Sequence, residues 1–287
     1  MSTMLGAEVS TGFVASSAKE AAGGLSSFID EMRRRLIASP LVHVDETSDQ
    51  VRTKKWWFHV VSNELYTYLF ASPTRGKDAP DEAGVLAEFS GVMVHDRLAM
   101  YFKYDEATHA ICLAHVFREL EAIGVGWDQR WANDMTALLT EMNNAAHDAR
   151  SAGANALAPL LLEDYLARYD AIVEQGLLAN PAPLHRDRDY LERKSFNLVA
   201  ALKKLKPEAT RFVTDLRVPL TNNRAERDIR MLKLHSKISS CFQSDDGARN
   251  FATIRSYLST ARKHGVDGLD ALAMLFRGDA WMPPSIT

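Results

Sequence analysis

The sequence contains very little cysteine and no long apolar run. Among its 287 residues only Cys112 and Cys241 are cysteines, too few for a disulfide framework, which favours a reducing compartment. No stretch approaches the roughly 18 consecutive apolar residues of a membrane-spanning helix. The first residues also lack the basic and apolar regions of a secretory signal. We therefore expect a cytoplasmic protein that does not enter a membrane.

Several common catalytic motifs are also absent. The chain has no Walker loop, no Gly-x-Gly-x-x-Gly loop and no His-Glu-x-x-His pair. A Gly-x-Ser-x-Gly nucleophile elbow is missing as well. These absences argue against a nucleotide-hydrolysing P-loop enzyme, a dinucleotide-dependent oxidoreductase, a zincin and an α/β-hydrolase.

Charge is distributed unevenly along the chain. The net charge is −3, but residues 203–264 hold 14 Lys/Arg and 6 Asp/Glu, a local balance of +8. Such an asymmetry suggests a surface that faces a polyanion. A solvated helix face is the alternative explanation of the same charges.

Apolar periodicity predicts strands early in the chain and helices later. We expect a helix over 17–37, then strands over 41–45, 55–62, 65–70, 91–95 and 109–114, with a short helix over 81–89. Two residues, Asn63 and Glu64, separate the second and third strands, which is hairpin spacing. Helical patterns follow over 130–150, 156–177, 188–205 and 222–235. This order predicts an α/β sheet flanked by helices and interrupted by a helical insertion.

Three carboxylates stand out within this pattern. Asp45 and Asp96 each close a short β-branched run, and Glu226 lies on the expected helix over 222–235. If their strands are neighbours, the two aspartates can share a metal ion and Glu226 can bind a second. Mg²⁺ suits such a site because it prefers oxygen ligands. An aspartate after a strand is, however, often only a turn residue or a helix cap.

Three sequence blocks resemble the signature sequences of IS66-family transposases. They are HVDET at 43–47, HAICLAH at 109–115 and LTNNRAER at 220–227, and the likeness extends from about Val9 to about Phe276. The resemblance implies an RNase H-like mixed five-stranded sheet flanked by helices, with an all-helical insertion before the helix that carries the catalytic glutamate. It also implies a DDE triad of Asp45, Asp96 and Glu226 that binds two Mg²⁺ ions, with Mn²⁺ as an alternative.

On this basis we expect four regions. Residues 1–40 are a helical remnant of an upstream DNA-binding or linker region, and 41–125 are the first part of the catalytic domain. Residues 126–215 are the helical insertion, and 216–287 are the second part of the catalytic domain with C-terminal helices. Family members carry an upstream zinc-binding region and a helix-turn-helix, so the resemblance also implies that this chain is truncated.

Residues around the triad have expected supporting roles. Asn222 and Asn223 precede the glutamate helix, where they can cap it or position a phosphate or a metal-bound water. Cys112 and His115 support the site locally; a structural zinc site is the weaker interpretation, because no fourth ligand is evident. The predicted DNA-binding residues are basic and lie on or beside that helix: Arg224, Arg227, Arg230, Lys233 and Lys237.

The leading functional hypothesis is a DNA transposase that cleaves and joins strands at insertion-sequence ends. Its expected partners are the element ends, the target DNA, a second copy of the chain and accessory proteins encoded nearby. A truncated remnant that only binds DNA or protein is the alternative from another class. A metal-dependent nuclease without strand transfer would use the same residues.

Overall fold

The computed structural model describes residues 9–182, 190–239 and 241–285, which form two compact units. The first unit consists of the chain up to Met93, Ala99–Thr108 and the chain from Asn223 onward. The second consists of Val94–Leu98 and His109–Asn222. The predicted break at 180–183 and the predicted helix start at Arg188 fall partly outside the described residues.

A five-stranded sheet has the order β3-β2-β1-β4-β5. Its strands are β1 (Leu41–Val51), β2 (Lys54–Ser62), β3 (Thr67–Ser72), β4 (Val92–His95) and β5 (Thr108–Ile111). β2 pairs antiparallel with both β1 and β3. The α/β class and the five strands predicted from the sequence are therefore confirmed.

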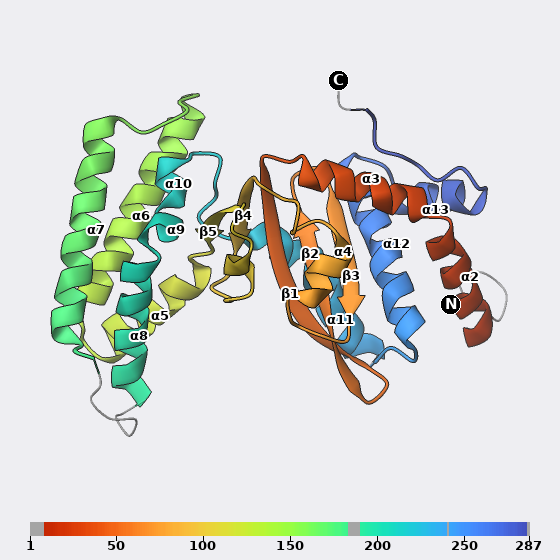
Figure 1. Ribbon diagram of the computed structural model, residues 1–287, viewed down its shortest axis with the longest axis horizontal. Helices are drawn as coiled ribbons and strands as arrows, with labels where there is room; N and C mark the ends of the chain where they lie inside the picture. Colours follow the sequence, from red (N-terminus) through yellow and green to blue (C-terminus); the bar gives the residue numbers. More distant parts are fainter. Residues whose placement is uncertain (1–8, 183–189, 240, 286–287) are drawn as a thin grey trace. The chain divides into compact units, whose positions relative to one another are not determined.

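Three helices of the first unit, α3 (Ser26–Ile37), α11 (Asn223–Ser239) and α12 (Asp245–Lys263), pack on β1, β2 and β3 (Figure 1). α11 lies against β1 and β2, and α12 lies against β3 and α2 (Thr11–Gly23). Strand and helix residues share one apolar core: Val51, Trp56, Phe58, Val60, Leu69, Ala225, Ile229, Leu232, Phe242, Ala248 and Ala252. The remaining helical elements are α4 (Asp78–Ala83), η1 (Tyr101–Lys103) and α13 (Gly268–Phe276).

The second unit is mainly helical. Its helices are α5 (Ala114–Gly126), α6 (Arg130–Ser151), α7 (Pro159–Ala179), α8 (Tyr190–Lys204), α9 (Lys206–Ala209) and α10 (Arg211–Thr214). α6 packs against α5 and α7, and α7 packs against α8. At Gly176 of α7, an added Cβ would lie 2.7 Å from Val199 and 2.9 Å from Trp131, so the close approach of these helices requires glycine. The helical patterns at 130–150 and 156–177 are confirmed. No helix in the described part of the chain has the length and apolarity needed to cross a bilayer.

The structure corrects the predicted end of the first strand. β1 does not stop at Asp45 but continues to Val51, because its second half pairs with β2 as far as Val51 opposite Lys54. Arg52 then adopts φ +54 and turns the chain into β2. Asp45 is therefore a residue within a strand, opposite Val60, and not a strand-end residue.

Several other boundaries also differ from the prediction. The helix expected over 17–37 is two helices, with Gly24 and Leu25 between them. The β2–β3 connection spans four residues, since Ser62 pairs with Thr67. The helix expected over 81–89 is α4, which ends at Gly84 because that residue adopts φ +69. The sequence also suggests Asp81 as the cap of this helix, but Asp81 lies within its first turn.

The strand expected over 109–114 is also shorter than predicted. β5 ends at Ile111, and α5 begins at Ala114. The N–H of Cys112 donates to the His95 carbonyl at 2.7 Å, and the N–H of Leu113 donates to the Leu220 carbonyl at 3.0 Å. Cys112 therefore follows the strand, whereas His115 lies in the first turn of a helix.

Candidate active site

Asp45 lies on the face of the sheet that α11 covers. Side chains of a strand alternate between the two faces, so Asp45, Asp49 and Val51 share one face. Val51 belongs to the apolar core beneath α11, and so does Val60, the residue paired with Asp45. Further along the same face, the Asp49 carboxylate lies 3.3 Å from Nδ1 of His235 on α11. The β1 register thus directs Asp45 toward the α11 layer.

Glu226 lies in the first turn of that helix. Ala225, Ile229 and Leu232 form the buried stripe of α11 against the sheet. Glu226 directly follows Ala225, so it lies about 100° round the helix from it, at the flank of the stripe. Glu226 and Asp45 are both half-buried. Two of the three predicted carboxylates thus lie on elements that pack against each other.

Asp228 shows which flank of α11 carries Glu226. The Asp228 carboxylate contacts α12, where it accepts hydrogen bonds from Ser259 Oγ at 3.4 Å and Lys263 Nζ at 2.8 Å. Residues two apart on a helix are separated by about 200°. Glu226 therefore lies on the side of α11 that faces away from α12.

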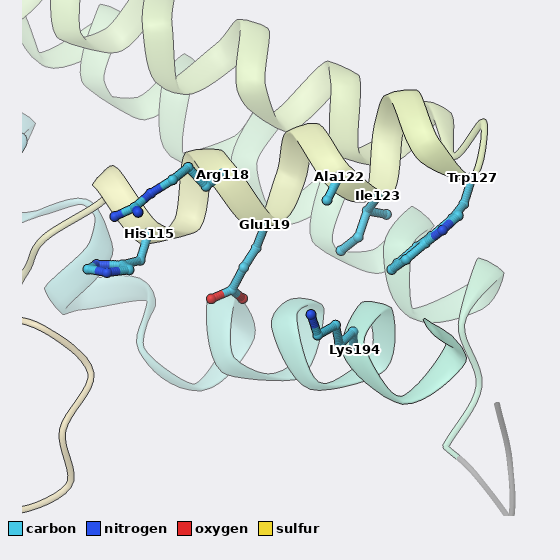
Figure 2. A pocket seen from close by; sticks show the side chains of 7 residues that line it. All are labelled: His115, Arg118, Glu119, Ala122, Ile123, Trp127 and Lys194. Atoms are coloured by element: carbon cyan, nitrogen blue, oxygen red, sulfur yellow. The ribbon is translucent and has the colours of Figure 1, made fainter. Parts of the chain in front are cut away.

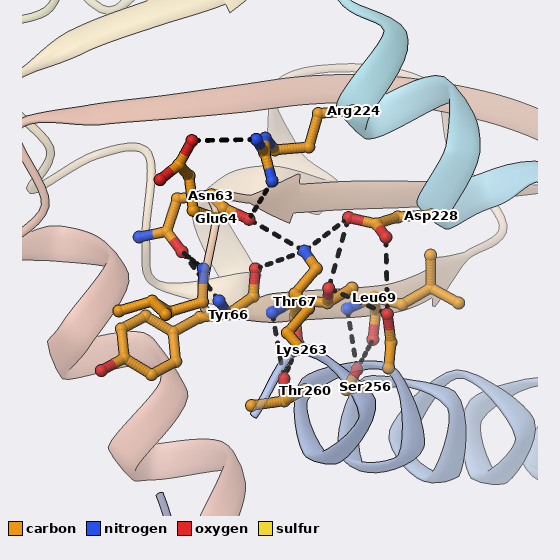
Figure 3. A network of polar contacts seen from close by, with 12 residues as sticks. Asn63, Glu64, Tyr66, Thr67, Leu69, Arg224, Asp228, Ser256, Thr260 and Lys263 are labelled. Carbon is orange, nitrogen blue, oxygen red and sulfur yellow. Dashed lines mark hydrogen bonds and ion pairs between the residues drawn. The ribbon is translucent and has the colours of Figure 1, made fainter. Parts of the chain in front are cut away.

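Around Asp228 a buried polar network joins α11, α12 and the β2–β3 connection (Figure 3). Lys263 Nζ also donates to the carbonyls of Asn63 at 2.9 Å and Tyr66 at 3.0 Å. Thr67 Oγ1 donates to the Asp228 carboxylate at 3.3 Å. Burial lowers the pKa of Lys263, and the nearby Asp228 carboxylate opposes that shift. The network holds the turn of α11 that carries Glu226 against the rest of the unit.

The predicted DNA-binding residues divide into two groups. Arg224 is tied to the β2–β3 connection, because its Nη2 lies 3.1 Å from a carboxylate oxygen of Glu64. It therefore contributes to the anchoring of α11. The other four side chains are exposed to solvent: Arg227, Arg230, Lys233 and Lys237.

The sequence reasoning gave no role to Glu46, although it directly follows Asp45. Alternation places Glu46 on the opposite face of the sheet, where its side chain is only 3% exposed. Arg75 Nη2 donates to it at 2.7 Å, and the Tyr101 hydroxyl donates to it at 2.7 Å. These contacts make Glu46 a buried structural partner. The charge itself was visible in the sequence, but its partners lie 29 and 55 residues away.

Asp96 belongs to the second unit and directly follows β4, as predicted. It is half-buried, and its Oδ1 accepts a hydrogen bond from the Leu98 N–H at 2.8 Å. The preceding residue, His95, is fully buried; burial lowers its pKa to about 3. His95 Nδ1 contacts the Asp96 carbonyl, and its Nε2 lies 3.0 Å from His109 Nδ1. A neutral His95 with its proton on Nδ1 satisfies both contacts. The convergence of Asp96 with Asp45 and Glu226 remains a prediction.

Two of the supporting residues meet in the second unit. The N–H of Asn222 donates to Cys112 Sγ at 3.1 Å, and both residues are buried. His115 is exposed on α5, and Asn223 is exposed at the start of α11. Cys112 and His115 are therefore not adjacent ligands on one strand, which removes the sequence basis for a zinc site there.

Across residues 9–182, 190–239 and 241–285, no three His, Cys, Asp or Glu side chains form a group that could hold a metal ion. The donor chemistry of the predicted triad nevertheless fits Mg²⁺. All three members are half-buried carboxylates, which supply the hard oxygen ligands that this ion prefers.

Comparison with known proteins gives the family. Residues 1–250 match the transposase IS66 family, and the chain therefore belongs to that family. The chain is also similar to the uncharacterized protein y4qI of Sinorhizobium fredii, with 25% identity over 93% of this chain and 53% of the relative. It thus spans about half the length of that relative. No solved structure matches the chain.

Proposed function

We propose that this chain is the catalytic region of a DNA transposase, with Asp45, Asp96 and Glu226 as a DDE triad. The observation that carries the proposal is the packing of α11 on β1, which brings Glu226 to the sheet face that carries Asp45. Membership of the IS66 family supplies the class of reaction, DNA transposition. The five-stranded sheet flanked by helices agrees with an RNase H-like domain. The helices from α6 to α10 would form the proposed insertion.

The carboxylates would hold two divalent ions, of which Mg²⁺ fits the donor set best. When bound, such ions lower the pKa of an attacking water or 3′-hydroxyl and stabilise the leaving oxygen. The chain itself contributes a rigid support. Asp45 is fixed within a strand paired with β2, and Glu226 is fixed on a helix anchored through Arg224 and Asp228.

The exposed basic residues of α11 provide the proposed DNA contact. Arg227, Arg230, Lys233 and Lys237 continue from the first turn of the helix to its end, and all are exposed. Arg230 lies four residues and Lys233 seven residues after Glu226, so these side chains share its side of the helix. A phosphate backbone bound along this side would pass close to the carboxylate.

The proposed function is tested by nicking of a supercoiled plasmid that carries the ends of the element, in the presence of Mg²⁺. Glu226→Gln keeps the size of the side chain but removes its charge, and we expect no detectable Mg²⁺-dependent nicking. Asp246→Asn, at a carboxylate that is 82% exposed on α12, is the matched control and should retain activity. Unchanged nicking by Glu226→Gln would refute the assigned triad.

A further inference from the structure

The second unit has a groove between α5 and α8 that the carboxylate chemistry does not use (Figure 2). Seven residues line it: His115, Arg118, Glu119, Ala122, Ile123, Trp127 and Lys194. Positions 115, 118 or 119, and 122 recur every three or four residues, so they form one face of α5. Lys194 faces them from α8, and Trp127 follows the last residue of α5.

The groove has an aromatic end and a cationic end. Figure 2 shows Trp127 and Ile123 toward one end, and His115 and Arg118 toward the other. Glu119 and Lys194 extend into the space between the two helices. Among the seven lining residues Glu119 is acidic, and Arg97 Nη2 contacts its carboxylate and balances its charge. The groove therefore offers a planar apolar surface at one end and positive charge at the other.

We propose that this groove binds a nucleoside phosphate unit, with the base against Trp127 and the phosphate near Arg118 and Lys194. Every nucleobase has a π-face that stacks on an aromatic side chain, and such stacking does not depend on base identity. Arginine and lysine are the usual partners of phosphate. An acidic peptide would satisfy the cations but would leave the indole without a planar partner.

The size of the groove limits the ligand. Its volume is about 180 Å³, below the roughly 300–1,000 Å³ of pockets that enclose a small molecule. At a rise of 1.5 Å per residue, the nine steps from Arg118 to Trp127 correspond to roughly 13 Å along the axis of α5. The groove thus has room for one base and the phosphate beside it. A nucleotide within a single strand and a free mononucleotide share this chemistry.

The affinity of the full chain for a fluorescently labelled single-stranded oligonucleotide of about 20 nucleotides is measured by fluorescence anisotropy. The variant Arg118→Ala/Lys194→Ala removes both cations of the groove. We expect its affinity to fall on the order of tenfold, and the slope of log affinity against log salt to decrease by about 0.7, because the groove holds one phosphate and each single-strand phosphate contact contributes about 0.7. The control Arg168→Ala/Lys203→Ala removes two cations of the same unit, and Lys203 lies on the opposite side of α8 from Lys194. Equal losses in both double variants would overturn the proposal.

Base stacking is tested separately. Trp127→Ala should weaken binding on the order of tenfold, and Trp127→Phe should restore most of the affinity. An oligonucleotide of the same length without bases should bind wild-type protein and Trp127→Ala equally. Equal binding of the normal oligonucleotide by wild type and Trp127→Ala, with unchanged melting temperature, would overturn the stacking.

The source of the nucleotide follows from competition. Millimolar deoxyadenosine monophosphate and unlabelled strand are compared as competitors of the labelled oligonucleotide, at equal concentrations of nucleotide. If the two displace it equally well, the groove is assigned to free nucleotides. Displacement by the strand alone assigns it to DNA. All these binding measurements can be made in Glu226→Gln protein. A failed nicking experiment would therefore leave this proposal intact, and failure of this proposal would leave the triad untouched.

Discussion

At the residue scale, the ion pair of Asp228 and Lys263 in the first unit is buried, unlike an ordinary ion pair on a protein surface. The two side chains are only 9% and 14% exposed, and Lys263 also satisfies two backbone carbonyls. Removal of one member of a buried ion pair leaves the other charge without compensation. We therefore expect the pair to affect stability mainly when one partner is removed and the other charge is left buried alone.

Lys263→Met should lower the free energy of unfolding by about 3–5 kcal/mol, because it leaves Asp228 buried and unpaired. The double variant Asp228→Asn/Lys263→Met should lose less than the single variant. Urea denaturation measures both. As a control, Arg168→Ala breaks an exposed pair with Glu141 and should cost less than about 1 kcal/mol. A Lys263→Met protein as stable as wild type would contradict the role of the pair.

His59 gives a pH prediction. Burial lowers the pKa of His59 below its usual 6.5; Nε2 lies 3.5 Å from the Thr74 carbonyl, and the ring stacks on Phe70. Below pH 6.5 the His59 imidazole binds a proton in the unfolded chain but stays neutral in the folded chain. The free energy of unfolding therefore falls as the pH decreases. His59→Phe should reduce this loss between pH 6.5 and 5, by up to about 1.4 kcal/mol per pH unit. Parallel pH profiles for wild type and variant, measured by thermal unfolding, would refute the assignment.

Single residues also show what the sequence can and cannot predict. Of Trp56 and Trp57, strand alternation predicts that one enters the core, and Trp56 does so at 2% exposure. The sequence analysis assigned roles to residues on or beside the glutamate helix, from Asn222 to Lys237. It missed Asp228, whose partner Lys263 lies 35 residues further along the chain. Local spacing reveals faces of elements, but not contacts between distant elements.

At the element scale, β3 is a terminal strand of the sheet whose free edge is covered by α12. Ser256 Oγ accepts the Leu69 N–H at 2.8 Å, and Thr260 Oγ1 accepts the Thr67 N–H at 3.0 Å. These hydroxyls accept the backbone N–H groups that a neighbouring strand would otherwise bind. They therefore protect the edge of β3 from pairing with another chain. The spacing of four residues on α12 aligns them along the strand edge.

Ser256→Ala should leave the buried Leu69 N–H without an acceptor, at a cost of about 1–3 kcal/mol. Hydrogen exchange at the Leu69 amide should accelerate more than exchange elsewhere in β2 and β3. Thr140→Ala is the matched control. The Thr140 hydroxyl donates to the carbonyl four residues earlier on α6, at 2.7 Å, and the side chain is exposed. Equal effects of the two substitutions would show that the contact with the strand edge contributes nothing.

The types of the elements were more predictable than their boundaries. Periodicity identified the strands and the long helices α6, α7, α8 and α11, because each has a continuous apolar pattern. It gave no bounds for α12, which spans 19 residues. The ends of β1, α4 and β5 depend on pairing and on local turns. β1 continues past Asp45 because β2 supplies partners up to Lys54, which no pattern within β1 reveals.

At the scale of the whole molecule, the chain combines a sheet-based unit and a helical unit. The IS66 family match spans residues from both. Asp45 and Glu226 belong to the first unit, and Asp96 belongs to the second. Residue patterns could nominate all three carboxylates, because each lies in a distinctive local sequence. Whether the three carboxylates converge depends on tertiary structure, which such patterns do not encode.

Binding of Mn²⁺ tests the shared site most directly. Electron paramagnetic resonance would measure free Mn²⁺ in titrations of the full chain with DNA carrying the element's ends. The variants are Asp45→Asn, Asp96→Asn and Glu226→Gln, with Asp246→Asn as the control. We expect wild type and control to bind the ion equally, and each triad variant to lose most of this binding. If Asp96→Asn binds Mn²⁺ as well as wild type does, the three carboxylates do not form one metal site.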